Sequence, residues 1–139
     1  MASFSVFQHI QAALSYPGNL LRLSFLSEYS RVKSWSKSAK IHFENPYSSQ
    51  KILLIALFQK GQLRADVAEL MANARRNGIY IVAVNNLKLE NPEDLKELCD
   101  CYVERYNFGR DFGSFKWGFC HLIKHGHLDS CPRLLMVND

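Results

Sequence analysis

The sequence predicts an α/β fold, with a mainly parallel sheet of about four strands and helices on both sides of it. Three observations support this prediction. Four apolar runs of strand length occur between residues 51 and 139, and segments of helical periodicity separate them. The connections are short, which favours right-handed crossovers and parallel pairing. Residues 51–139 are therefore expected to form a Rossmann-like domain.

Residues 1–50 are expected to be a helical N-terminal extension followed by a linker. One helical pattern runs up to Pro17 and Gly18, a weaker one follows, and residues 34–38 predict a linker. A basic amphipathic helix can lie on a membrane surface. Residues 1–40 are thus expected either to touch a membrane peripherally or to pack on the domain or a partner. The apolar positions of the two patterns are Phe4, Phe7, Ile10, Ala13 and Leu14, then Leu20, Leu21, Leu23, Phe25, Leu26 and Tyr29.

The first two predicted strands are residues 52–58 and 79–84. Both are continuous apolar runs, typical of strands that are covered on both faces. A turn at residues 59–62 precedes a helix, which Asn77 and Gly78 are expected to end. The apolar positions of this helix are Leu63, Val67, Leu70, Met71 and Ala74.

A short helix is predicted from Asn91 to Leu98, because a capping side chain, a proline and two acidic residues stand at its start. A third strand over residues 101–105, a helix over 112–124 and a fourth strand over 133–137 follow. The last helix is expected to bury Phe112, Phe115, Phe119 and Leu122.

The composition excludes several classes of function. Seventeen basic and thirteen acidic residues give a net charge of +4, which suits a small anionic ligand but is too small to indicate nucleic acid. The four cysteines lack zinc spacing and are expected to be reduced thiols. His121 and His125 lie one helical turn apart, but no nearby carboxylate in the sequence completes a metal site. Without a secretory signal or an apolar run of membrane length, the expected location is cytoplasmic.

The candidate site lies where the predicted strands end. Ligands of parallel α/β sheets bind beyond the carboxyl ends of the strands, and several polar residues and glycines follow those ends. The candidate binding residues are Asn85, Asn86, Asn107, Gly109, Arg110, Asp111 and Gly113, and the candidate metal ligand is Asp139.

Two interpretations of the segment around Arg110 stay open. Its glycines would let a ligand approach a helix N-terminus, where Arg110 would bind a diphosphate and Asp111 would accept from sugar hydroxyls. Alternatively, Asp111 caps the helix, Arg110 pairs with a surface acid and the glycines only make a turn. Asn85 and Asn86 would likewise contact a base or ribose, or make an Asx turn.

Asn138 and Asp139 follow the fourth strand and offer hard oxygen donors. Such donors would hold a Mg²⁺ or Mn²⁺ ion that bridges a diphosphate leaving group. The alternative is a pair of turn residues at a strand end.

Four segments, residues 57–63, 77–85, 104–116 and 133–139, resemble the rhamnan synthesis protein F family in order and separation. That family acts in bacterial cell-surface polysaccharide assembly and is related to glycosyltransferases of the A-type fold. The resemblance implies a nucleotide-sugar donor over the strand ends, with Asn107, Gly109, Arg110 and Asp111 in its pocket. It also implies a glycan acceptor, a metal and diphosphate motif at Asp139, and a location at the inner face of the cell membrane.

The chain departs from the family because the family continues well past that motif. A general base must reach the acceptor hydroxyl, and no residue here is assigned that role, so the catalytic residues are unknown. The leading hypothesis is therefore the donor-binding half of an incomplete glycosyltransferase. The alternative is a non-catalytic binding module that keeps the α/β fold. Another nucleotide binder is disfavoured, because no glycine-rich phosphate loop follows residues 52–58.

Overall fold

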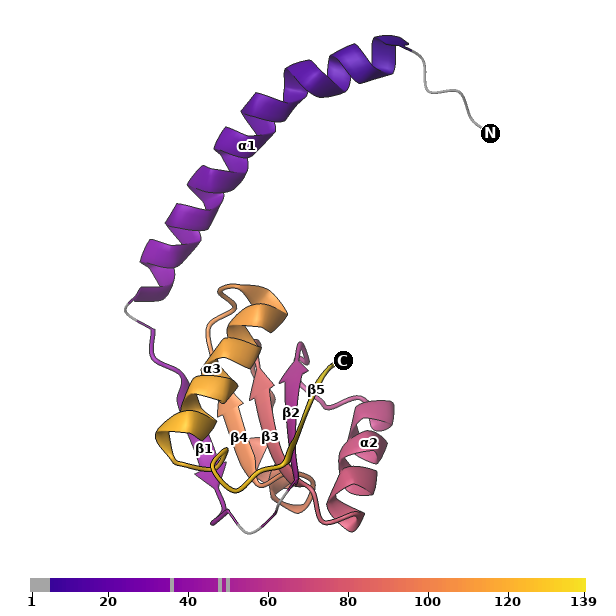
Figure 1. Ribbon diagram of the computed structural model, residues 1–139, viewed down its shortest axis with the longest axis vertical. Coiled ribbons are helices and arrows are strands. Elements are labelled where there is room, and N and C mark those ends of the chain that lie inside the picture. The colour runs from indigo at the N-terminus through magenta and orange to yellow at the C-terminus, as the bar shows by residue number, and fades with distance from the viewer. Residues whose placement is uncertain (1–5, 36, 48, 50) are drawn as a thin grey trace. The chain divides into compact units, whose positions relative to one another are not determined.

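The computed structural model describes residues 6–35, 37–47, 49 and 51–139. It divides the chain into two compact units, Met1–Ser36 and Lys37–Asp139. The described part of the first unit is helix α1 (Val6–Trp35), and the second unit holds every strand of the described chain. Figure 1 shows the elements of both units.

Helix α1 is continuous, with Pro17 inside it, so the predicted break at Pro17 and Gly18 is wrong. An internal proline removes one helical hydrogen bond and commonly kinks a helix without ending it. The helix also includes Ser34 and Trp35, which were expected to belong to a linker. Phe4 lies outside the described residues, and so do the side chains of residues 7–14.

The rest of α1 exposes large apolar side chains. Phe25 and Leu21 are about three-quarters exposed, at 75% and 74%. Among the described residues, no helix combines the length and the apolar character needed to cross a membrane. The other exposed apolar side chains of α1 are Tyr16, Leu20, Leu23, Leu26, Tyr29 and Val32.

The second unit is built on a five-stranded, mostly parallel sheet with the order β1-β4-β3-β2-β5. This arrangement confirms the α/β class. The four predicted strands are present and pair parallel with one another. The strands are β1 (Lys40–Glu44), β2 (Lys51–Leu57), β3 (Tyr80–Asn85), β4 (Cys101–Glu104) and β5 (Arg133–Asn138).

Strand β1 was not predicted. It lies at one edge of the sheet and pairs antiparallel with β4. Its five residues alternate in polarity, as edge strands do, so they lack the apolar run that marks a buried strand. The second unit therefore begins at Lys37, and the predicted boundary at residue 50 falls inside it.

Helices cover both faces of the sheet (Figure 1). Helix α2 (Ala65–Arg76) packs with Val67, Met71 and Ala74 on one core cluster, and α3 (Arg110–Lys124) packs with Leu122 on the other. The 3₁₀ helix η1 (Pro92–Glu97) stands where the short helix was predicted. These layers leave the carboxyl ends of the parallel strands beside the start of α3.

The predicted buried stripe of α3 is correct for Phe115 and Leu122, which pack on the core, and wrong for Phe112 and Phe119. Phe112 is 85% exposed and Phe119 is 41% exposed. The buried positions are Ser114, Gly118, His121 and Leu122. A Cβ at position 118 would lie 2.3 Å from Cδ1 of Leu54, so the helix packs too closely on β2 for a larger residue. Glycine at position 118 allows this close approach of the helix to the sheet.

Replacing Phe112 with alanine is expected to change the free energy of unfolding by less than about 0.5 kcal/mol, since the ring is exposed. A phenylalanine in the core would lose about 3–5 kcal/mol on the same truncation. Urea unfolding followed by circular dichroism measures the difference. A loss in the larger range would show that Phe112 belongs to the core.

Candidate functional site

The carboxyl ends of the parallel strands meet at one edge of the sheet, as the sequence predicted. In the registers of neighbouring strands, Leu57 pairs with Asn85, and Asn85 pairs with Glu104. Ala56 pairs with Asn138 on the other side of β2. The ends of β2, β3, β4 and β5 are thus level with one another.

Asn85 is fully buried, and its side chain makes hydrogen bonds that connect neighbouring segments of the fold. Its Oδ1 accepts hydrogen bonds from the backbone N–H groups of Gln59 and Leu87, at 3.1 and 3.3 Å. Its Nδ2 lies 2.9 Å from the Gln59 carbonyl oxygen, to which it donates, and 3.1 Å from the Tyr102 hydroxyl. The bond to Leu87 closes an Asx turn, as the structural interpretation of Asn85 expected. A contact of Asn85 with a base or ribose stays a prediction.

Asn86 is also buried, at 4% exposure, but it points toward the candidate site. Its Oδ1 accepts from Nη1 of Arg105 at 2.8 Å and from the Ser114 hydroxyl at 3.0 Å. Its Nδ2 has no hydrogen-bond partner among the described residues. Asn86 therefore joins the end of β3 to β4 and to the first turns of α3.

Arg105 organises this corner, although it was not among the predicted site residues. Its guanidinium also donates to the backbone oxygens of Phe108, at 2.5 Å, and of Arg110, at 3.5 Å. Burial lowers the pKa of Arg105 from its usual value. A basic residue directly after a strand was the only signal for this role, because its partners become visible only in the folded chain.

The turn before α3 depends on its two glycines. Gly109 has φ +75°, and the following Arg110 also has a positive φ of 48°. A Cβ at Gly113 would lie 2.1 Å from the Phe108 carbonyl oxygen. Asn107 ends the preceding segment with a buried Oδ1 that has no hydrogen-bond partner among the described residues. The turn therefore has little tolerance for larger residues at Gly109 and Gly113.

Asp111 does not cap α3. The N-cap is Gly109, and no side chain of the described residues makes a capping hydrogen bond there. Asp111 instead accepts a hydrogen bond from Nδ2 of Asn138 at 3.1 Å, which joins the start of α3 to the end of β5. The first N–H groups of the helix are left to other partners.

Asp139 binds the end of β2. Its carboxylate accepts hydrogen bonds from the backbone N–H of Phe58, at 3.1 Å, and from Nε2 of Gln59. Those hydrogen bonds connect the end of β5 to the end of β2. The described residues bring three metal-ligating side chains together at one place, and Asp139 is not among them. A Mg²⁺ or Mn²⁺ ion at Asp139 stays a prediction.

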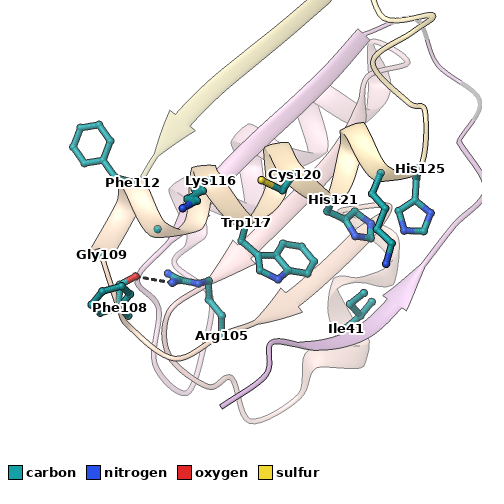
Figure 2. A pocket seen from close by; sticks show the side chains of 12 residues that line it. Ile41, Arg105, Phe108, Gly109, Phe112, Lys116, Trp117, Cys120, His121 and His125 are labelled. Carbon is teal, nitrogen blue, oxygen red and sulfur yellow. Dashed lines mark hydrogen bonds between the residues drawn. The ribbon is translucent and has the colours of Figure 1, made fainter. Parts of the chain in front are cut away.

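A groove of about 760 Å³ runs along α3 from Gly109 to His125. Arg105 and Phe108 line one end, and Trp117 lies under the helix while Phe112 points away from it (Figure 2). Lys116 and Lys124 add two further cations. This lining suits a ligand with a flat ring and negative charge.

The structure also corrects the expectation that no carboxylate lies near His121. Oε1 of Glu44, on β1, is 2.8 Å from Nε2 of His121. The two residues are far apart in the sequence, and the unpredicted strand brings them together. Cys101 lies next to both, and burial raises the pKa of its thiol to about 12.

Comparison with known proteins gives one partial similarity. No family model matches the chain, and no solved structure matches it. A stretch of 68 residues is 38% identical to Virulence protein VirA of Vibrio anguillarum, and the same values hold for VirA of Vibrio anguillarum strain ATCC 68554 / 775. The match covers 47% of this chain and 22% of that protein, so the chain spans about a fifth of the length of these curated relatives.

Proposed function

We propose that the second unit binds a nucleotide sugar, as the donor-binding half of a glycosyltransferase-like protein of bacterial cell-surface polysaccharide assembly. The fold would then be the Rossmann-like half of an A-type glycosyltransferase. One observation carries the proposal. A cationic groove with aromatic walls opens beside an uncapped helix N-terminus, at the carboxyl edge of a parallel sheet.

The N-terminus of α3 would bind the diphosphate group of the donor. Gly109 and Gly113 keep side chains away from the first turn of α3, whose N–H groups favour an anion. Arg105 lies at the same end of the groove, and its bond to Asn86 fixes the direction of its guanidinium. Arg110 is exposed on the same turn. A diphosphate would therefore meet backbone donors and fixed positive charge together.

The groove along α3 would hold the base and the sugar of the donor. Its volume of about 760 Å³ lies within the usual range for small-molecule sites. The Trp117 ring offers a face on which a base or sugar can stack, and Lys116 adds charge. The resemblance assigns Asn107 and Asp111 to the same pocket. A divalent cation at Asp139, a glycan acceptor and a location at the inner face of the cell membrane belong to the proposal on the resemblance alone.

A non-catalytic binding module is the second candidate. Two residues expected at the site, Asn85 and Asp139, use their polar side chains to hold the sheet edge. No described residue is assigned as a general base. The two candidates share donor-site geometry and differ in whether sugar transfer follows.

Replacing Arg105 with glutamine is expected to weaken donor binding about tenfold or more, because a hydrogen bond to a charged group contributes about 1.5–3 kcal/mol. Isothermal calorimetry with UDP-, dTDP- and GDP-sugars, with and without Mn²⁺, measures the dissociation constant of each donor for the wild type and the variant. Lys116→Gln, at an exposed position of the same groove, tests the charge without disturbing the corner. Arg76→Gln on α2 is the matched control and should bind as the wild type does.

Either of two results would refute the proposal. One is that the wild type binds none of these donors at millimolar concentration. The other is that Arg105→Gln and Lys116→Gln, both folded by circular dichroism, bind as tightly as Arg76→Gln.

A further inference from the structure

A separate group of metal-binding side chains lies where β1, β4, α3 and the loop after α3 meet. It consists of Glu44, Cys101, His121 and His127, called here the Glu–Cys–His cluster. The ligand atoms of Glu44, Cys101 and His121 all lie within 4.8 Å of one another. Oε1 of Glu44 is also 3.9 Å from Nε2 of His127. Figure 2 shows His121 at the end of the groove opposite Arg105.

Two members of the cluster are buried, while Glu44 lies at its exposed side. Cys101 is 1% exposed and His121 is 8% exposed. The side chains of Glu44 and His127 are 26% and 15% exposed. Cys99, the neighbouring buried cysteine, donates to the Leu95 carbonyl oxygen at 3.5 Å, whereas no such bond of the Cys101 thiol is found among the described residues. The Cys101 thiol therefore lies beside the Glu44 carboxylate and the His121 imidazole, at the margin of a hydrophobic core cluster.

Aromatic rings hold both imidazoles in place. Trp117 stacks on His121, with ring centres 4.9 Å apart and planes inclined by 12°. Tyr47 stacks on His127, with ring centres 4.6 Å apart and planes inclined by 20°. Metal sites need ligands whose directions are fixed by their surroundings, and these stacked rings supply that support.

We propose that the Glu–Cys–His cluster binds one structural zinc ion through Sγ of Cys101, Nε2 of His121, Nε2 of His127 and one carboxylate oxygen of Glu44. Zinc takes sulfur, nitrogen and oxygen ligands of these kinds, and structural sites have four protein ligands in a tetrahedron. Tetrahedral ligand atoms lie about 3.3–3.8 Å apart at zinc bond lengths. Oε1 of Glu44 and Nε2 of His121 are 2.8 Å apart, so these two atoms would move apart to admit the ion.

Binding exchanges a proton for the metal. The Sγ–zinc bond forms as the Cys101 thiol releases its proton to the solvent, while both histidines bind as neutral imidazoles. The ion would then join strand β1 to α3, which the Glu44–His121 pair also connects. Its role is to hold the edge strand of the second unit, and its binding is tested without any sugar donor.

X-ray absorption at the zinc edge on the purified full chain tests the ligand set without a substitution. The expected spectrum shows one sulfur at about 2.3 Å and three nitrogen or oxygen atoms at about 2.0–2.1 Å. Zinc added to chelator-treated protein is expected to bind with a stoichiometry of one and to raise the melting temperature. Failure to bind one equivalent of zinc, or a first shell without sulfur, would overturn the proposal.

Variants loaded with Co²⁺ in place of zinc show which side chains bind the metal and which only lie near it. The wild type is expected to show an intense thiolate-to-cobalt band and the visible absorption of tetrahedral cobalt. Cys101→Ser should lose the thiolate band, and His127→Gln should weaken binding about tenfold or more. Cys120→Ser, at an exposed position of the same helix, should keep the wild-type spectrum. A thiolate band that survives Cys101→Ser, or is lost in Cys120→Ser, would refute the assignment.

Discussion

Replacing Asn85 with alanine is expected to lower the free energy of unfolding by about 2–5 kcal/mol. The substitution removes four hydrogen bonds at a position with no solvent exposure. It leaves the N–H groups of Gln59 and Leu87 without their acceptor, and each buried unsatisfied group costs about 1–3 kcal/mol. Urea unfolding of the full chain measures the loss.

Asn77→Ala is the matched control for this experiment. Asn77 is exposed, and its side chain makes one hydrogen bond, to the Asn73 carbonyl oxygen at 2.8 Å. Its removal is expected to cost no more than about 0.5 kcal/mol. If Asn85→Ala is as stable as this control, the side chain does not hold the sheet edge, and its assignment to the fold is wrong.

Replacing Gly113 with alanine is expected to cost about 1–3 kcal/mol and to abolish donor binding, because overpacking forces the backbone to move. The new Cβ would meet the Phe108 carbonyl oxygen at 2.1 Å and both terminal nitrogens of Arg105 at 2.8 Å. It would thus displace both the turn and the guanidinium that the proposed site uses. Thermal unfolding and calorimetry on the same protein measure the two losses.

Gly18→Ala provides the comparison, since a Cβ there has no atom of the described residues within 4 Å. Alanine at this helical position should not lower stability and should leave donor binding unchanged. If Gly113→Ala has the same melting temperature and the same donor affinity as Gly18→Ala, the backbone around Arg105 can move to accept the added methyl group without cost. The close approach of the turn to α3 would then have no bearing on the site.

Local patterns predicted the central elements of the fold. Residues 52–58 and 79–84 are continuous apolar runs, and both became buried parallel strands, β2 and β3. Strand β1 was missed because its residues alternate in polarity and its partner strand in the described chain, β4, lies far along the sequence. Helix α3 was found, but only half of its predicted buried face, Phe115 and Leu122, packs on the core. Helical spacing cannot show that Gly118 must approach Leu54 closely.

The position of the candidate site could be predicted more fully than the roles of its residues. Strand ends placed Asn85 and Asp139 at the correct edge, yet both side chains bind backbone groups brought near by folding, at Gln59 and Phe58. Arg105 was missed because its partners come from β3 and from the turn before α3. The Glu44–His121 pair joins residues on separate elements and left no local pattern. Tertiary contacts, rather than residue type, decide these roles.

The most direct test of the proposed donor site is a titration of the ¹⁵N-labelled chain with UDP-, dTDP- and GDP-sugars, followed by amide chemical shifts. At least one donor is expected to shift the amides of Gly109, Gly113 and Trp117 in a saturable way, while the amides of α2 on the opposite face stay unchanged. Absence of saturable shifts with every donor at millimolar concentration would contradict it. So would shifts confined to α2.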